Sequence, residues 1–340
     1  MKSLFGVRVG LASAFVISVV NASAANAANV TVESYGGWTN CFVLRGGDCK
    51  AVLVPAVGGR ILHYSINGEN IIYENPELWG ETLLTKSNFW AGGYQCDVGP
   101  ELRGIPDHKW LWQGPWSAQV PHPSAAHTAS QPEMTLGIQM EKEIVIDPDT
   151  GDLGITQRMR NVINNDVSFC LWDRTLSKGG GFAMFPLSAK SRFKHGWSIR
   201  QGKRVPEYRY ESDKPEDQRV RIMDGVLVAQ AKALPDAREM KVGADSDAGW
   251  IAYARGKILF VKYFPVFANG NYSDGGNSVE FYCNDRVAEL EPLSPEVTLK
   301  PGENYSFPEK WALIELEKEV TSYEQARALV KRIPKTPFAK

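Results

Sequence analysis

Short runs of alternating apolar and polar residues, separated by turn-forming residues, extend through this chain from Val30 to about Glu317. Alternation at period two places successive side chains on opposite faces of a strand, and Val, Ile, Tyr, Phe and Trp favour strands. Long strands joined by turns pack as two sheets. The sequence therefore predicts a mostly β chain, a large antiparallel two-sheet β-sandwich, with strands over 49–57, 60–66, 134–146, 153–163, 249–264 and 310–316.

The clearest antiparallel hairpin covers residues 134–163, where the segment DPDTGD (147–152) is a strong turn signal between two long strands. In the second strand, positions 155–161 alternate between two faces that both carry polar residues. Such mixed faces indicate a sheet with one side in water, suited to lining a groove. Helical periodicity occurs from Ser322 to Ile333, which predicts a short C-terminal helix.

The N-terminus has a basic start, an apolar run over 9–20 and small residues after it. This pattern predicts a secretory signal peptide over 1–27, with a run too short to anchor the protein in a bilayer. We therefore expect a periplasmic or secreted protein with no membrane span after cleavage. No linker or charge block divides the remainder, so 28–318 is expected to form one domain and 319–340 the C-terminal helix and tail.

The charge balance limits the classes of ligand. The formal net charge is −1, whereas nucleic-acid binding needs a concentrated basic face. We expect no nucleic-acid partner, and a neutral ligand. The chain has no Cys-x-x-Cys pair, scattered histidines and no Gly-x-Ser-x-Gly motif, so we expect neither a metal site nor a cofactor.

Five cysteines in an exported chain suggest oxidation. Cys41 and Cys49 flank the turn-like segment RGGD, and the spacing predicts that a disulfide between them staples a β-hairpin. An odd count requires at least one free thiol. The states of Cys96, Cys170 and Cys283 are left open.

Residues 88–117 hold the densest mixture of aromatic and polar side chains. Sugars stack their C–H faces on aromatic rings, while their hydroxyls need amides and carboxylates nearby. The segment therefore predicts a saccharide cleft, although some of its rings must belong to the core. The members of this mixture are Phe89, Trp90, Tyr94, Gln95, Asp107, His108, Trp110, Trp112 and Trp116, of which Tyr94, Gln95, Asp107 and Trp112 are candidate substrate-binding residues.

Three stretches carry a family resemblance: AVLVPAVGGRILHYSINGENIIYENP (51–76), FWAGGYQC (89–96) and AELEPLSPEVTLKPGENYSFPEKWALIEL (288–316). Together they resemble the galactose mutarotase-like (aldose 1-epimerase-like) superfamily, and in particular the exported bacterial domains of unknown function grouped with it. The resemblance implies the large sandwich of that superfamily, a mono- or oligosaccharide ligand, and isomerase activity on an aldose.

Mutarotation needs a base at the anomeric hydroxyl and an acid at the ring oxygen. The resemblance implies that Glu291 is the base, because Pro292 and the distance to Leu299 reproduce the family's closing strands. Glu289 lies on the same strand face, and two close carboxyls raise one pKa. The alternative is a pair of solvated strand carboxylates.

The general acid is where this sequence departs from the family. Within NVINNDVSFCLWDRTL (161–176), Arg174 stands where the resemblance expects a histidine, and arginine cannot transfer a proton at neutral pH. His108 or His195 could replace it, or Arg174 could bind a sugar carboxylate or hydroxyl pair, or form a structural salt bridge. Arg60 and Trp172 are further candidate substrate-binding residues.

Three functions remain open from the sequence. The leading hypothesis is an exported enzyme of the aldose epimerase type. The others are a saccharide-binding module of the same fold without catalysis, and a lyase or hydrolase acting on a polysaccharide. The sequence leaves the sugar and the oligomeric state open.

Overall fold

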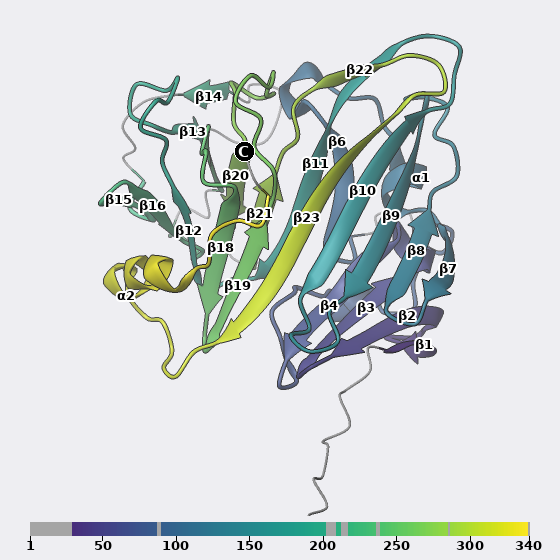
Figure 1. The fold of residues 1–340 in the computed structure, drawn as a ribbon, viewed down its shortest axis with the longest axis horizontal. Helices are drawn as coiled ribbons and strands as arrows, with labels where there is room; N and C mark the ends of the chain where they lie inside the picture. The colour runs from purple at the N-terminus through teal and green to yellow at the C-terminus, as the bar shows by residue number, and fades with distance from the viewer. Residues whose placement is uncertain are drawn as a thin grey trace, which may run out of the picture.

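The structure is a computed structural model that describes residues 29–86, 90–201, 209–211, 217–235, 239–284 and 286–338. The predicted signal peptide, residues 1–27, lies outside the described residues. Two antiparallel sheets pack face to face, with β10 and β23 in front of β6 and β11 in the view of Figure 1. This confirms the predicted two-sheet sandwich.

One sheet, called here the large sheet, has 13 strands. Along it the strands run in the order β1 (Asn29–Tyr35), β2 (Trp38–Gly46), β3 (Cys49–Val54), β4 (Arg60–Ile66), β6 (Tyr94–Gly99), β11 (Val167–Lys178), β21 (Val287–Pro292), β20 (Val279–Cys283), β17 (Met240–Ala244), β13 (Ser198–Gln201) and β14 (Arg209–Glu211), with β5 (Glu69–Asn70) paired to β4 and β22 (Val297–Leu299) paired to β11.

The other sheet, called here the small sheet, has 10 strands. Their order is β15 (Val220–Met223), β16 (Val226–Gln230), β12 (Phe182–Pro186), β18 (Trp250–Arg255), β19 (Ile258–Tyr263), β23 (Asn304–Glu315), β10 (Leu153–Asn161), β9 (Ile138–Ile146), β8 (Ala125–Ala129) and β7 (Ser117–His122). Short helical segments occupy the connections: η1 (Pro55–Val57), η2 (Pro76–Leu78), η3 (Glu101–Arg103), α1 (Lys109–Gln113), α2 (Tyr323–Leu329) and η4 (Val330–Arg332).

The main core lies between the sheets, because alternate residues of both point inward. Leu171 and Leu290 from the large sheet join Phe260 and Trp311 from the small sheet in one buried apolar cluster. Burial of apolar surface on both inner faces stabilises the sandwich. The same alternation turns the intervening residues of the large sheet toward its outer face, the face away from the small sheet.

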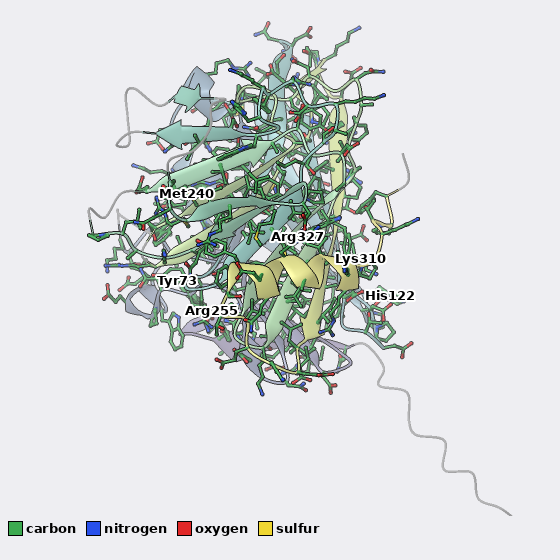
Figure 2. All side chains as sticks on the ribbon, turned by 90° about the vertical axis from the view of Figure 1, so that its left-hand side faces the viewer. Tyr73, His122, Met240, Arg255, Lys310 and Arg327 are labelled. Carbon is green, nitrogen blue, oxygen red and sulfur yellow. The ribbon has the colours of Figure 1, made fainter. Side chains whose placement is uncertain are left out.

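The predicted hairpin and terminal helix are both present. β9 and β10 are antiparallel, and Ile146 at the end of β9 pairs with Leu153 at the start of β10. In the turn between them, the Asp147 carboxylate accepts hydrogen bonds from two backbone N–H groups. Ser322 caps the helix α2, whose residue Tyr323 packs edge-on against Phe182 with ring centroids 5.2 Å apart. Figure 2 shows α2 lying across the small sheet, where it covers a second apolar cluster on the outer face of that sheet.

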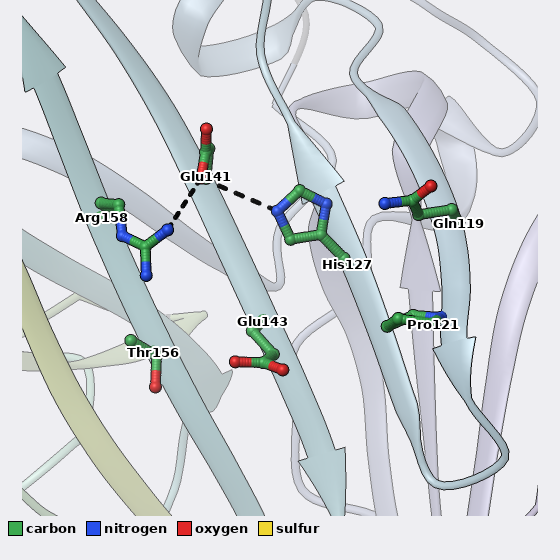
Figure 3. A pocket seen from close by; sticks show the side chains of 7 residues that line it. All are labelled: Gln119, Pro121, His127, Glu141, Glu143, Thr156 and Arg158. Carbon is green, nitrogen blue, oxygen red and sulfur yellow. Dashed lines mark hydrogen bonds and ion pairs between the residues drawn. The ribbon is translucent and has the colours of Figure 1, made fainter.

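The solvent face of β10 confirms the prediction of a wet sheet side. Together with β7, β8 and β9 it forms a hollow of about 180 Å³ (Figure 3). Within it Glu141 pairs with Arg158 at 3.3 Å and with His127 at 3.8 Å. The hollow is lined by Gln119, Pro121, His127, Glu141, Glu143, Thr156 and Arg158, none of which belongs to the predicted sugar site.

The predicted disulfide between Cys41 and Cys49 is wrong. Both thiols are buried and free. In the β2–β3 pairing Cys49 lies opposite Gly46, well along the strand from Cys41. Cys49 faces the core between the sheets, whereas Cys41 packs in the cluster on the opposite side of the large sheet. The strand register therefore keeps the two sulfur atoms on different faces, out of bonding reach.

Candidate functional site

Six neighbouring strands bring ionisable side chains together on the outer face of the large sheet. In spatial order these strands are β6, β11, β21, β20, β17 and β13, of which β11, β21 and β20 can be followed in Figure 1. The loop after β6, running over η3 toward α1, adds further side chains. We call the group the outer charged cluster: Asp97, Glu101, His108, Arg174, Arg200, Lys241, Glu280, Glu289 and Glu291.

Strand alternation explains why these charges share one face. On β21, Ala288 and Leu290 point into the core between the sheets. Glu289 and Glu291 therefore point outward, about 6.7 Å apart along the strand at the usual rise of two residues. The same reasoning places Glu280 and Lys241 on the outer face of β20 and β17. The structure thus confirms that the two carboxyls predicted from the sequence share a face.

Arg174 is the central cation of the cluster. One guanidinium nitrogen lies 3.2 Å from Asp97 and another lies 3.5 Å from Glu289. The guanidinium also lies over two indoles, 5.1 Å from the ring centroid of Trp112 and 4.8 Å from that of Trp172. Burial disfavours the charged guanidinium and so lowers the pKa of Arg174, but the negative charges of Glu289 and Asp97 outweigh burial and raise that pKa. It is a fixed cation that orients its neighbours and cannot transfer a proton.

Lys241 forms the second centre. Its ammonium lies 2.8 Å from Glu280, 2.8 Å from Glu291 and 2.9 Å from Glu101. Burial disfavours the charged ammonium and so lowers the pKa of Lys241, but these three carboxylates outweigh burial and raise that pKa well above its usual value. The Trp172 indole N–H donates to Glu291 over 2.7 Å. Two donors therefore hold the carboxylate of Glu291 in place.

Glu289 is the group suited to donating a proton. Burial raises its pKa, and the charge of Glu291 adds to this effect, while Arg174 opposes it, leaving a pKa of about 7. A carboxyl with such a pKa is partly protonated at neutral pH and can act as a general acid. Glu289 and Glu291 thus differ in their surroundings: Glu289 has a raised pKa, whereas the side chain of Glu291 is held by an ammonium and an indole.

His108 contacts the cluster but is fully engaged. Its ring nitrogens lie 2.6 Å from the Pro106 carbonyl oxygen and 2.7 Å from Asp97. Burial lowers its pKa, but the hydrogen bond and charge of Asp97 outweigh this and raise it to about 9. The imidazolium donates to both partners at neutral pH. His108 therefore positions Asp97, and through it Arg174, more readily than it would protonate a ligand.

The structure leaves unsatisfied polar groups on this face. Gln95, opposite Arg174 in the β6–β11 pairing, is only 1% exposed. Neither polar atom of its amide has a hydrogen-bond partner among the residues that the structure describes, and the same holds for the indole nitrogen of Trp112. A buried polar group without a partner is costly.

The other predicted site residues fall in different places. The prediction that Tyr94 binds substrate is wrong: it faces the core between the sheets, where its ring packs 5.1 Å from that of Trp311. Asp107 is 69% exposed and pairs with Lys109. Arg60 is buried and donates to the carbonyl oxygens of Gly92 and Trp112, which secures the loops beside the cluster.

The aromatic segment divides among several roles. Trp116 is buried in the core and Trp110 is largely exposed. Trp90 packs at a tilt against Tyr73, with ring centroids 5.4 Å apart. Among the described aromatic residues of the segment, Trp112 is the one whose ring lies against the cluster, with the Arg174 guanidinium over it. Phe89 lies outside the described residues. His195, the other candidate acid, is exposed.

Sequence reasoning missed five members of the cluster: Asp97, Glu101, Arg200, Lys241 and Glu280. All of them except Glu101 lie on strands, where they alternate with apolar residues that point inward, as in MKVGA (240–244) and VEFYC (279–283). That pattern is also typical of an ordinary wet face. The signal that distinguishes them is their meeting across strands far apart in the chain, which requires the sheet order.

A second buried ion group lies on the other side of β11. Lys262 contacts Asp173 at 2.5 Å, the Thr175 hydroxyl at 2.8 Å and Glu309 at 3.5 Å. Gln157 donates to Glu309 over 2.6 Å. We call Gln157, Asp173, Thr175, Lys262 and Glu309 the inner charged cluster. All five side chains are buried between the two sheets, inside the main core.

Within the described ranges, no group of His, Cys, Asp and Glu side chains is arranged to hold a metal ion. Around Lys241 the carboxylates surround an ammonium. None of the helices in the described part of the chain is both long and apolar enough to span a membrane.

The fold matches solved structures. A galactose mutarotase-like protein from Lactobacillus casei aligns with TM-score 0.58 at 12% identity, covering 81% of this chain and 100% of that one. The chain has the galactose mutarotase-like fold. A mutarotase-related enzyme from Lactobacillus acidophilus aligns with TM-score 0.53 at 10% identity over 83% of this chain and 100% of that one. A mutarotase-like protein from Clostridium acetobutylicum gives 0.54 at 10% identity, covering 84% and 98%.

At such identities the comparison establishes the fold. No protein-family model matches the sequence, and no curated protein matches it.

Proposed function

We propose that this chain is an exported sugar-processing enzyme of the aldose 1-epimerase type, with its active site at the outer charged cluster. The observation that carries the proposal is the pair Glu289 and Glu291. They share one face of β21, and burial raises the pKa of Glu289 to about 7, while Glu291 is held by Lys241 and Trp172. The proposed acid and base thus lie on one strand face, about 6.7 Å apart along the strand.

The proposed chemistry moves two protons. Glu291 takes the proton of the anomeric hydroxyl as the bond from the anomeric carbon to the ring oxygen breaks, and Glu289 gives its proton to that oxygen. The open-chain aldehyde rotates, and the reverse transfers close the ring to the other anomer. Arg174 and Lys241 hold the carboxyls in place throughout, and both remain charged.

Two further features support a sugar ligand. The amide of Gln95 and the indole N–H of Trp112 have no hydrogen-bond partner among the described residues, and both side chains lie beside Arg174. Proteins of the same fold are described as galactose mutarotase-like or mutarotase-related. The fold itself hosts more than one function, so the carboxyl pair, and not the fold, carries the proposal.

One observation favours a binding module without catalysis. Each cluster carboxyl on β20 and β21 already contacts a cation, and Glu291 is almost fully buried. Such a network resembles a site built to hold a ligand through a fixed hydrogen-bond pattern.

NMR exchange spectroscopy of purified mature protein with a panel of free aldoses and uronic acids tests the proposal. We expect faster interconversion of α and β anomers for at least one sugar. Measurable binding without acceleration of any sugar would replace the enzyme with the binding module. Release of oligosaccharides from a polysaccharide would instead favour lyase or hydrolase action.

The export proposal rests on the sequence pattern of residues 1–27. Fractionation of cells that express the full chain should find it in the periplasm or medium, with the N-terminal segment removed. Recovery of the intact chain in the cytoplasm would contradict export.

A further inference from the structure

A loop carboxylate sits on two cations of the outer charged cluster. Glu101, on η3, points one carboxylate oxygen at Arg200 over 3.0 Å and the other at Lys241 over 2.9 Å. The two cations come from neighbouring strands, β13 and β17. Glu101 thus bridges them, one oxygen to each.

Glu101 differs from the other carboxyls of Lys241. Its side chain is 33% exposed, whereas those of Glu280 and Glu291 are almost fully buried on the sheet. It is carried by a connection outside the sheet, while both cations belong to strands. Of the three carboxylates at Lys241, Glu101 is the one that can leave without moving a strand.

We propose that Glu101 occupies the place of a ligand carboxylate, and that the sugar of this site is a uronic acid whose carboxylate displaces Glu101 from Arg200 and Lys241. This inference rests on the proposed function, because it places the sugar ring over Glu289 and Glu291.

The sugar's own geometry fits this placement. In a pyranose uronate the carboxylate-bearing carbon and the anomeric carbon both flank the ring oxygen. The ammonium group of Lys241 contacts both Glu291, the proposed base, and Glu101. Strands β17 and β13 lie two and three places from β21 in the sheet, but the ammonium of Lys241 reaches across β20 to within 2.8 Å of Glu291. A ring over Glu289 and Glu291 therefore has its carboxylate within reach of that ammonium, at the position where Glu101 now contacts Arg200.

The charge of the site favours an anion once Glu101 leaves. Burial is the largest influence on both Glu280 and Glu289, and it raises their pKa values to about 8 and about 7. These two carboxyls therefore carry less than a full charge each at neutral pH, which lowers the negative charge beside Arg174 and Lys241. The cations are Arg60, His108, Arg174, Arg200 and Lys241, and the carboxyls other than Glu101 are Asp97, Asp274, Glu280, Glu289 and Glu291.

The whole-chain net charge of −1 favoured a neutral ligand, but it averages over the entire surface. The local balance at Arg200 and Lys241 is what a ligand meets. A carboxylate bridging two cations gains two charge-assisted hydrogen bonds, whereas a neutral hydroxymethyl group cannot displace Glu101.

The test compares sugars that differ only at the carboxylate. Isothermal titration of the mature protein with D-glucuronate against D-glucose, and with D-galacturonate against D-galactose, measures the preference. We expect tighter binding of a uronate than of its neutral partner. If Glu101 occupies the cation pair about nine-tenths of the time, Glu101→Gln should raise uronate affinity about tenfold, and the ratio of uronate affinity to neutral-sugar affinity should rise with it.

A matched control separates displacement from a general loosening of the loop. Arg103 of the same η3 segment pairs with Glu296 at 2.6 Å, so Glu296→Gln loosens the loop without touching the cation pair. Glu296→Gln should leave both affinities unchanged. An equal rise in both variants, or an equal rise for neutral and acidic sugars in Glu101→Gln, would overturn the inference. A thermal melt of each variant checks that it folds.

The remaining outcomes are equally decisive. Neutral sugars that bind and interconvert as well as uronates, with no effect of Glu101→Gln, would retain the proposed function and reject the acidic substrate. Tighter binding of D-glucose 6-phosphate than of D-glucuronate would reject the carboxylate in favour of a phosphate. Absence of binding by every sugar would reject both the inference and the function on which it rests.

Discussion

Replacing Glu291 by Gln is the sharpest test of the active site, because the structure predicts that the variant folds. One carboxylate oxygen of Glu291 accepts from the Trp172 indole and contacts Lys241, and the amide oxygen of Gln can take its place. The other oxygen has no hydrogen-bond partner among the described residues, so the amide nitrogen displaces no donor. Lys241 keeps its contacts with Glu101 and Glu280.

The loss should therefore be chemical. Removal of a general base costs about 10²–10⁴ in rate, which corresponds to about 2.7–5.4 kcal/mol in the activation free energy. Because the amide keeps the shape and polarity of the side chain, sugar binding should change little, so the effect should appear in kcat and not in KM. Glu289→Gln, the matched variant two residues away, should lower kcat too, by removing the proton donor.

The assay is NMR exchange between the two anomers at saturating sugar, on the sugar that the wild-type protein converts fastest. A thermal melt of each variant accompanies it. Wild-type kcat in Glu291→Gln would refute its role as the base. If Glu289→Gln abolished turnover while Glu291→Gln did not, the base would be Glu289.

Three further predictions concern Glu289, Trp112 and Lys262. The proton donor Glu289 has a pKa raised to about 7 by burial, so kcat should fall as the pH rises above about 7; a rate that increases through this range would count against it. Trp112→Ala should weaken sugar binding by about 0.5–1.5 kcal/mol with a small change in melting temperature; calorimetry and a melt check both, and a large melting shift with unchanged affinity would make the ring structural. Lys262→Met removes the cation from Asp173 and Glu309 and should destabilise the fold by about 3–5 kcal/mol at pH 8. That loss should shrink at pH 5, because burial raises the pKa of Asp173 and only Lys262 lowers it among the nearby ions, so protonation removes the buried charge once Lys262 is gone. Equal losses in urea unfolding at both pH values would contradict this account.

Local patterns were sufficient for the architecture. The turn at 147–152 joins β9 and β10 as predicted, and β4 runs over the predicted residues Arg60–Ile66. The predicted strand 49–57 ends early at Val54, because Pro55 lacks the N–H that a ladder needs and starts η1 instead. These features depend on neighbours in the chain, which the sequence displays directly.

The site depended on contacts that the sequence does not display. Glu289 and Glu291 were found because they share a strand with a recognisable closing segment. Lys241 was missed because a lone lysine in a short strand is usually solvated, and only its pairing with three carboxylates from separate segments reveals its role. Tyr94 was assigned to the wrong face of its strand, because in a dense aromatic stretch the sequence does not show which of two successive residues points into the core.

Strand β11 constrains how this protein can change in evolution. Asp173 and Thr175 belong to the inner charged cluster, while Trp172 and Arg174 serve the outer one. A point substitution in β11 alters one of the two clusters, but a single inserted or deleted residue would turn the side chains of each cluster to the opposite face of the sheet. It would drive a guanidinium between the sheets and remove the carboxylate that neutralises Lys262. We therefore expect relatives of this chain to vary in side-chain identity along β11 and never in its length between Trp172 and Thr175.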